Sequence, residues 1–570
     1  MGLGRRSFLG IVALAAFGAC FASTEQHGQE EGVRAEDDLR FRAGAVDKTL
    51  PDVDAVGYEI ALRVEDTAGH ETFTADVKGT FVATRALDEL TLDLEGNVVD
   101  EVSVGGRTAP HRREGAALTI TLPTPATEGS IVSTRVKLHG DVRQADGANP
   151  NDFTTFGGLM VRQHNADGRK IFTSLDWPSK ARRWLPVKDH PRDGAAVAFD
   201  VTFPKTYVVL ANGKKLGETE NADGTKTWRY EANTPMPTYD FHVSAYDDWQ
   251  VNAGRASSGV PISTYTYTSS AQHVDEIYGD LPKAFEFYES IFGPYRWGTA
   301  NFLEEPIFGG GMEHASVVSM DETLFRNPRS ARDTAFHELA HHWSGNLVRI
   351  RQWNDFWLSE GFTEYLKARA LTQIYGEAEK KRVYSEYRSR AFAADARKPH
   401  PLAPRGDEID VLTIFDAISY QKGALVLRML ERIVGEKTLT TFLAGWFERH
   451  AFQAVSTADF ERELSEAAGR DLSAFFASFV YAASHPELRV TFAGTPGGET
   501  DVTVEQVQSV GPQDGYVFPL DLDFVDAAGA TERVTIELTS KTTTKRIRLG
   551  RTPSSVVVDP EQYAIATIAE

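Results

Sequence analysis

Residues 337–341 read His-Glu-Leu-Ala-His, and after eighteen intervening residues His341 is followed by Glu360. On a helix, positions i and i+4 lie on one face, so His337 and His341 can reach one ion. Glu338 would point beside that ion, where a general base is useful. Two histidines and one glutamate, with one position left for water, form the open site of a catalytic zinc hydrolase.

An alternative is a surface helix with two solvated histidines. Glu360, on a second predicted helix, argues against it, because a buried glutamate is stable only with a partner such as a metal. Residues 310–314 read Gly-Gly-Met-Glu-His, and glycines let the backbone approach a ligand closely. A simple glycine-rich turn before a helix explains that segment equally well.

The composition limits the possible functions. The chain has 570 residues, of which 41% are hydrophobic and 11% aromatic, enough to bury several cores and to exclude a disordered chain. The 81 acidic and 60 basic residues give a net charge of −21, which argues against nucleic acid as a partner. The one cysteine, Cys20, excludes an intramolecular disulfide and cysteine-based metal sites, so a metal must bind through histidine and carboxylate.

The N-terminus reads as a targeting segment. Arg5 and Arg6 precede an apolar run, which predicts a signal peptide over 1–22 and a flexible linker over 23–50. The two arginines resemble a twin-arginine export signal, and an ordinary secretory signal is the alternative. Cys20 suits lipid attachment, whereas cleavage after Ala22 would release a free protein. We therefore expect an exported protein of the periplasm or cell envelope, or a secreted one, held to a membrane only through a lipid anchor.

The hydrophobic period changes twice along the chain. Period-two alternation from Tyr58 to about residue 248 predicts strands, as in Tyr58, Ile60, Leu62 and Val64. Helical spacing follows from about Val274 to Ala483, and alternation returns from Leu488. Helices are predicted near residues 284–291, 331–348, 356–376, 376–394, 417–434, 437–449, 457–468 and 472–483. The predicted domains are 51–250, 251–485 and 486–570, a multidomain α+β chain.

Several segments together resemble the aminopeptidase N family of zinc metallopeptidases. These are Gly-x-Met-Glu at 310–313, the histidine and glutamate pattern ending at Glu360, and Tyr-Gln-Lys-Gly at 420–423. Residues 181–191, which include Ala-Arg-Arg-Trp-Leu-Pro and Asp-His-Pro, are similar to its N-domain signature. The resemblance runs from about residue 50 to 570. It implies an N-terminal antiparallel β-domain, a thermolysin-like, mainly helical catalytic domain and a small C-terminal β-sandwich-like domain.

The resemblance also implies roles for individual residues. One Zn²⁺ per chain would be held by His337, His341 and Glu360, with Glu338 as general base. Tyr420 would stabilise the oxyanion, and Glu313, with Gly310, Gly311 and Met312, would bind the free amine of a peptide. His314 stands where the family usually has asparagine. Asp176 could share the substrate amine, or lie in a solvated turn. Glu364 could orient a ligand histidine, or face solvent.

The sequence thus predicts a zinc-dependent aminopeptidase that acts on peptides with a free N-terminal amine. A thermolysin-like endopeptidase is a second hypothesis, against which the Gly-x-Met-Glu element and the N-domain signature speak. A catalytically inactive binding protein is a third, although such relatives usually lose a metal ligand or the general base. The family's large helical C-terminal domain has no counterpart in this sequence, which predicts a more open cleft.

Overall fold

The computed structural model describes residues 41, 46–67, 69–145, 152, 155–164, 167–495 and 498–569. The predicted signal peptide and most of the predicted linker lie outside the described residues. Residues 41–570 form one compact unit, so the predicted boundaries near residues 250 and 485 remain predictions. Within the described ranges, no helix has the length and apolar character needed to cross a bilayer.

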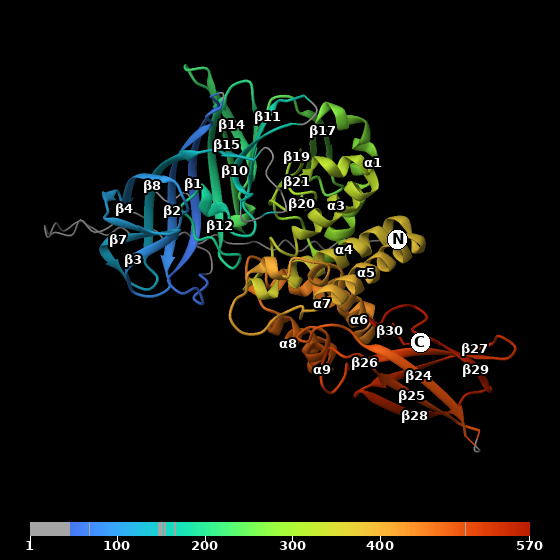
Figure 1. Ribbon diagram of the computed structural model, residues 1–570. Coiled ribbons are helices and arrows are strands. Elements are labelled where there is room, and N and C mark those ends of the chain that lie inside the picture. Colours follow the sequence, from blue (N-terminus) through green and yellow to red (C-terminus); the bar gives the residue numbers. More distant parts are fainter. Residues whose placement is uncertain are drawn as a thin grey trace, which may run out of the picture. The chain divides into compact units, whose positions relative to one another are not determined.

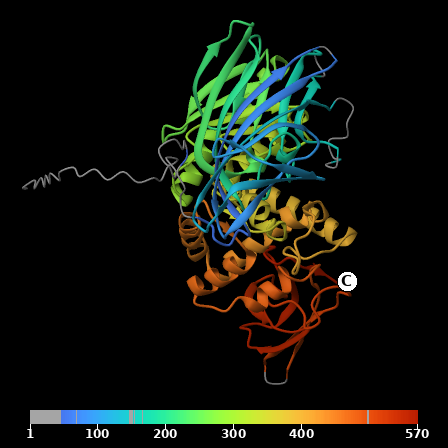
Figure 2. The same cartoon turned by 90° about the vertical axis from the view of Figure 1, so that its left-hand side faces the viewer.

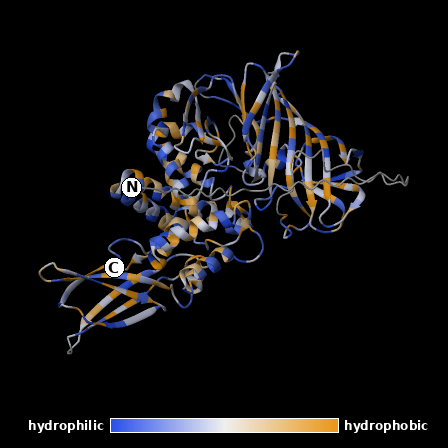
Figure 3. Ribbon diagram, turned by 180° about the vertical axis from the view of Figure 1, so that it is seen from behind, coloured by the Kyte–Doolittle hydropathy of each residue, from blue (hydrophilic) through white to orange (hydrophobic). Residues whose placement is uncertain are grey.

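The first strands build a large sheet (Figure 1, blue to green). In β1, Tyr58, Ile60 and Leu62 are buried while Ala61 and Arg63 face outward, as the alternation predicts. Figure 3 shows the same alternation as orange and blue segments along the strands. All neighbours in this sheet are antiparallel except β1 and β12, which pair in parallel. The strand order is β14 (Lys214–Glu220), β15 (Thr225–Pro237), β12 (Gly194–Pro204), β1 (Val53–Glu65), β2 (Thr72–Ala83), β8 (Ile131–Asp141), β4 (Val98–Val104), β5 (Arg107–Thr108).

Two smaller sheets complete this β-rich part. In the first, Leu90 pairs with Ile120 and Leu92 with Leu118, and all four are buried. Its order is β3 (Leu87–Asp93), β7 (Ala117–Ala126), β6 (His111–Glu114). The second has the order β13 (Val208–Ala211), β16 (Val243–Tyr246), β11 (Lys170–Leu175), β10 (Gly158–Gln163), β9 (Arg143–Gln144).

A five-stranded sheet precedes the main helices and was not predicted. Its order is β17 (Gln250–Arg255), β18 (Pro261–Thr266), β19 (Ala300–Glu305), β21 (Val317–Asp321), β20 (Gly311–Met312). Strands β18, β19 and β21 are parallel, and every residue of β19 and β21 is buried. Strands buried on both faces show no alternation, which explains why the sequence pattern did not reveal them.

The helices are coloured yellow-green to orange in Figures 1 and 2, and the first two lie between β18 and β19 in the chain. They are α1 (Val274–Tyr278), α2 (Leu281–Phe292), α3 (Pro328–His341), α4 (Trp357–Tyr375), α5 (Glu377–Arg397), α6 (Gly423–Val434), α7 (Glu436–Arg449), α8 (Thr457–Ala468) and α9 (Ser473–Phe479). Short 3₁₀ turns are Ala181–Arg183, Thr238–Asp240, Thr268–His273, Glu322–Arg326, Trp353–Asp355 and Val411–Thr413, and a π-helical turn spans Ile418–Lys422. Helix α3 ends at His341, earlier than the predicted residue 348, because the chain turns at Gly345 with φ +123°.

The last strands form two facing sheets (Figure 1, red). Phe492 and Phe524 come from different sheets, and their ring centroids lie 5.8 Å apart, as in a sandwich core. One sheet has the order β28 (Thr542–Ile547), β25 (Thr500–Gln506), β24 (Glu487–Gly494), β30 (Thr567–Ile568). The other has the order β27 (Thr531–Leu538), β26 (Phe518–Asp526), β29 (Pro553–Val558). A separate short pair joins β22 (Arg349–Ile350) and β23 (Ala454–Val455). The predicted fold class, β-rich then helical then β, is confirmed.

Candidate metal centre and active site

Helix α3 presents three of the predicted residues on a buried surface. The helix begins after Asn327, whose side chain accepts a hydrogen bond from the Ser330 amide at 3.3 Å. Near its other end, His337, Glu338 and His341 are 7%, 4% and 1% exposed. Their side chains therefore meet inside the protein rather than in solvent, which excludes the surface-helix alternative.

The two histidines converge with Glu360 on helix α4. His337 Nε2 lies 3.0 Å from His341 Nε2. Glu360 Oε2 lies 3.1 Å from His337 Nε2 and 3.2 Å from His341 Nε2. Three donor atoms from two helices thus approach one point.

These three atoms suit a metal cation. Each histidine makes a contact through its Nδ1 atom, which leaves its Nε2 atom available to bind the ion. His341 Nδ1 lies 2.9 Å from the Ser344 carbonyl and must donate to it. His337 Nδ1 faces Glu364 Oε1 at 3.2 Å. Neutral rings would then aim both Nε2 lone pairs at each other and at the Glu360 carboxylate, an arrangement that a bound cation, either a proton or a metal ion, relieves. Bonds of about 2.0–2.2 Å to a tetrahedral ion would hold such donors about 3.3 Å apart, close to the spacing observed.

Further groups orient the two histidines. Glu364 is buried, and it contacts Lys367 Nζ at 2.6 Å as well as His337. Burial raises the pKa of Glu364, but the charge of Lys367 and the hydrogen bond with His337 outweigh this, so its pKa is lowered well below the ordinary value. Of the two alternatives for Glu364, the structure favours contact with a ligand histidine. The Thr363 hydroxyl lies 3.2 Å from His341 Nδ1.

Glu338 lies beside the metal donors. Its donor atom is within 4.8 Å of those of His337 and His341. Burial raises the pKa of Glu338, and the charges of the two histidines oppose that rise. A Cβ at Gly311 would lie 2.3 Å from Glu338 Oε1, so only glycine lets strand β20 pass this close to the carboxylate.

Glu313 follows β20 and is 5% exposed. Asn346 Nδ2 donates a 2.7 Å hydrogen bond to the Glu313 backbone carbonyl and so holds the loop. Burial raises the pKa of Glu313, the charge of His341 lowers it, and the charge of Glu360 raises it. The Glu313 carboxylate therefore stands close to the metal donors in a partly desolvated position.

Tyr420 enters the site from the π-helical turn Ile418–Lys422. The turn lies against α4 because Gly361 and Gly423 meet there: a Cβ at Gly361 would lie 2.8 Å from the Gly423 Cα. Burial raises the pKa of Tyr420 well above its usual value, as do the charges of Glu360 and Glu313 and the hydrogen bond to Glu360. The Tyr420 hydroxyl thus stays protonated and beside the predicted metal ligand.

One cavity of about 240 Å³ collects these groups. Its lining includes every predicted site residue except Asp176: Gly310, Gly311, Met312, Glu313, His337, Glu338, His341, Glu360 and Tyr420. Further lining residues that were not predicted for the site are Trp177, Phe308, Thr334, Lys367, Arg390, Phe415 and Gln421. Gln421 and Trp177 are adjacent in sequence to predicted residues, whereas nothing in the local pattern around Arg390 indicates the site.

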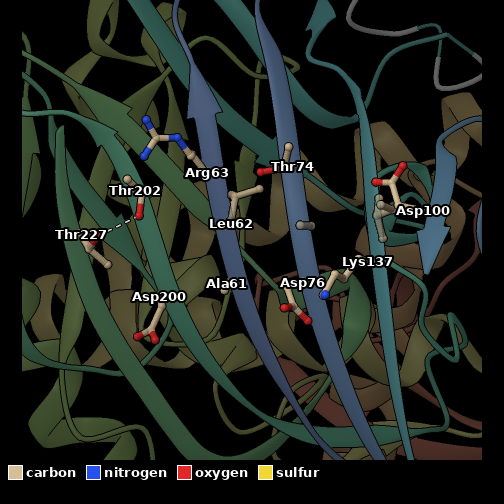
Figure 4. Close-up of a pocket in the computed structure, with 12 residues that line it drawn as sticks. Ala61, Leu62, Arg63, Thr74, Asp76, Asp100, Lys137, Asp200, Thr202 and Thr227 are labelled. Atoms are coloured by element: carbon tan, nitrogen blue, oxygen red, sulfur yellow. Dashed lines mark hydrogen bonds between the residues drawn. The ribbon is translucent and has the colours of Figure 1, made fainter. Parts of the chain in front are cut away.

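A larger hollow, of about 480 Å³, lies on the outer face of the eight-stranded sheet (Figure 4). Arg63, Asp76 and Lys137 line it, and the Thr202 and Thr227 hydroxyls hydrogen-bond at 2.8 Å. No histidine is among its lining residues, so its chemistry differs from that of the cavity over α3 and α4.

Asp176 does not reach the candidate site. Its side chain is fully buried and accepts hydrogen bonds from Trp184 Nε1 at 3.0 and 3.1 Å. Neither alternative from the sequence holds, since Asp176 neither lines the cavity nor lies in a solvated turn. His314 is also fully buried: its Nδ1 lies 3.0 Å from Ser319 Oγ, and its ring stacks on His242 at 4.1 Å.

Comparison with known proteins gives a consistent result. Residues 55–239 match the peptidase M1 N-terminal domain, and residues 278–479 match the peptidase family M1 domain. Aminopeptidase 2 of Candida albicans is 26% identical over 84% of this chain and 53% of its own. Leukotriene A-4 hydrolase of Xenopus laevis is 27% identical over 69% of this chain and 66% of its own.

A solved structure shares the fold. The crystal structure of Legionella pneumophila aminopeptidase A in complex with aspartic acid has a TM-score of 0.77 and 17% identity. The similarity covers 91% of this chain and 60% of that chain. The chain spans about half to two thirds of the length of the curated relatives named above.

Proposed function

Because this chain belongs to peptidase family M1, we propose that it is a zinc-dependent aminopeptidase that removes the N-terminal residue from peptides. One observation carries the proposal. Three donor atoms meet at 3.0–3.2 Å in the cavity that Glu313 and Glu338 also line. Candidate metal donors and a carboxylate that could bind a substrate ammonium thus share one cavity of about 240 Å³.

His337, His341 and Glu360 would hold the ion. A bound zinc ion would lower the pKa of a water molecule toward ~7 and polarise the substrate carbonyl. Glu338 would accept the proton of that water and deliver it to the departing amine, a task that suits a buried carboxylate with a raised pKa. The Tyr420 hydroxyl would donate a hydrogen bond to the carbonyl oxygen as negative charge develops there.

Glu313 would set the exopeptidase character. A free peptide amine is positively charged near pH 7, and a carboxylate in a buried position binds it selectively. Because Glu313 lies in the same cavity as the metal donors, a substrate held by its ammonium would offer its first peptide bond to them. A thermolysin-like endopeptidase would not need this buried carboxylate.

The test combines metal content with turnover in the full chain. We expect one zinc per chain and hydrolysis of an amino-acid anilide, with both lost in His341→Ala. Glu338→Gln should keep the metal and lose nearly all turnover, because an amide cannot accept the proton. His342→Gln is the matched control, since His342 is the next residue and also buried, but is absent from the cavity lining.

A full equivalent of zinc in His341→Ala would show that the metal site is wrong. Equal turnover of an endopeptidase substrate blocked at its N-terminus would favour the endopeptidase hypothesis. Bound zinc without turnover of any peptide would favour the binding-protein hypothesis.

Export is a separate proposal, supported by Arg5, Arg6 and the apolar run that follows. Mass spectrometry of the envelope fraction should find a mature chain that lacks residues 1–19 with a lipid on Cys20, or lacks residues 1–22. A chain with Cys20 unmodified and still joined to the upstream peptide would contradict both forms.

A further inference from the structure

A buried lysine lies two residues after Tyr420 and is absent from the lining of the cavity that holds the reacting groups. Lys422 is fully buried. Its Nζ donates to Asp395 Oδ1 and Oδ2, both at 3.0 Å, and to the Ser484 carbonyl at 2.6 Å. All three ammonium hydrogens therefore have an acceptor, which an ammonium group removed from water requires.

Asp395, on helix α5, is held in the same way. Besides Lys422 it binds His485 Nδ1 at 2.7 Å, and the His485 ring lies against Phe392 at 4.4 Å. Burial raises the pKa of Asp395, but the hydrogen bond from His485 and the charge of Lys422 outweigh this and leave its pKa lowered. The carboxylate thus stays charged. Burial lowers the pKa of Lys422, and the charge of Asp395 and the hydrogen bond to it oppose that fall.

This cluster joins three segments that are distant in sequence. Asp395 belongs to α5, Lys422 to the π-helical turn, and Ser484 and His485 to the connection between α9 and β24. The same connection is tied to the C-terminal strands, because the Tyr516 hydroxyl donates to the Ala483 carbonyl at 2.7 Å. The turn that carries Tyr420 is therefore held in place by groups that do not line the cavity.

A π-helical turn needs such fixing. It holds one residue more than an α-helical turn, its hydrogen bonds are less favourable, and it survives where the surroundings impose it. Here Lys422 N bonds to the Ala417 carbonyl at 3.0 Å, five residues back. If the turn relaxed to α-helical spacing, Tyr420 would rotate about the helix axis by about 100° per residue of shift, away from Glu360.

We propose that Lys422 and Asp395, completed by the Ser484–His485 segment, are positioning residues that hold the Tyr420 hydroxyl beside the metal ligands. The inference rests on the proposed function, because the position of Tyr420 matters for turnover only if its hydroxyl acts in the reaction. It also makes the segment leading to the C-terminal strands a determinant of turnover, although that segment does not line the cavity.

The experiment is a double-mutant cycle on the full chain. Lys422→Met and Asp395→Asn are each made alone and in the Tyr420→Phe background, and kcat, KM and zinc content are measured. We expect each to lower kcat by about 10- to 100-fold, as misplacing an oxyanion donor does, with KM and zinc nearly unchanged. In the Tyr420→Phe background the same changes should lower kcat by less than about twofold, because two changes acting through one group are not additive.

Asp521→Asn is the matched control. Asp521 accepts from Arg432 at 3.0 Å and so ties α6 to β26, but it does not touch the π-helical turn. We expect it to lower the melting temperature and to leave kcat unchanged. Hydrogen–deuterium exchange over residues 418–423 gives a readout independent of activity: exchange should rise in Asp395→Asn and not in Asp521→Asn.

The outcomes separate the two ideas. An equal loss of kcat with and without the Tyr420 hydroxyl would make the cluster a general structural support and overturn the inference. Unchanged exchange over 418–423 in a folded Asp395→Asn protein would overturn it as well. An unmutated protein that binds zinc but hydrolyses no peptide would instead contradict the proposed function. If Lys422→Met does not fold, the same kinetic comparison, made on Asp395→Asn and His485→Phe with and without the Tyr420 hydroxyl, tests the inference.

Discussion

Replacing Glu313 by glutamine removes one negative charge from the cavity and little volume. The Glu313 backbone is held by Asn346 Nδ2 at its carbonyl, at 2.7 Å, and this contact does not depend on the side chain. The loop and the metal donors should therefore keep their places. The expected change is a loss of binding for the substrate ammonium alone.

The size of the loss follows from burial. Glu313 is 5% exposed, so an ammonium paired with it would also be largely out of water. Breaking a buried charge pair by removing one member costs about 2–5 kcal/mol, because the other charge is left unpaired. At about 1.4 kcal/mol per factor of ten, kcat/KM for a free-amine substrate should fall about 30- to several-thousand-fold.

The assay compares an amino-acid anilide with its N-acetylated form in both proteins. The unmutated protein should strongly prefer the free amine, and Glu313→Gln should narrow that preference mainly by losing the free-amine rate. A parallel fall on both substrates would mean that Glu313 only supports the loop. Comparable rates on the two substrates in the unmutated protein would refute the proposal that it is an aminopeptidase.

Three further outcomes are expected. Glu364→Gln should weaken zinc binding about 10- to 100-fold by removing the charge that orients His337, which competition with a chelator will measure; unchanged affinity would remove Glu364 from the site. Burial, then the charge of Asp54, raises the pKa of Asp193 to about 8, so the folded protein binds a proton more tightly than the unfolded chain and loses stability as pH rises from about 4 to 8. Asp193→Asn should therefore become more stable relative to the unmutated protein as pH rises over that range, by at most about 1.4 kcal/mol per pH unit. Urea unfolding measures this, and equal dependence of the unfolding free energy on pH in the two proteins would contradict it. Gly361→Ala should cost about 1–3 kcal/mol of unfolding free energy and lower kcat, because its Cβ would meet the neighbouring backbone at 2.8 Å; a variant with unchanged stability and turnover would show that the two segments separate without cost.

The metal donors could be predicted because their chemistry is local in sequence. His337 and His341 share one helix face, so their spacing brings them together. Glu360 follows on the next long helix, and its approach to them depends on the packing of α4 against α3. The roles of Tyr420 and Glu313 could not be predicted in this way, because each assignment depended on the family resemblance. Their approach to the donors results from backbone contacts between distant segments, which a single sequence does not display.

Other features had no usable signal in the sequence. Strands β19 and β21 are buried on both faces, so their apolar runs carry no alternation. Asp176 stands next to Trp177, which does line the cavity, but in a strand-to-turn segment a shift of one residue reverses the direction of a side chain. The sequence around Lys422 gives no sign that it is buried, because Asp395 and Ser484 come close to it only when the chain folds.

The contact between Gly361 and Gly423 limits how this protein can change. A Cβ at either position would press on the backbone opposite, at 2.8 and 2.9 Å, so the two segments meet without intervening side chains. Glu360 precedes Gly361 and Tyr420 lies three residues before Gly423, so this contact helps to position both. Adaptation to new substrates is thereby directed to lining residues outside this contact, such as Trp177 and Phe308.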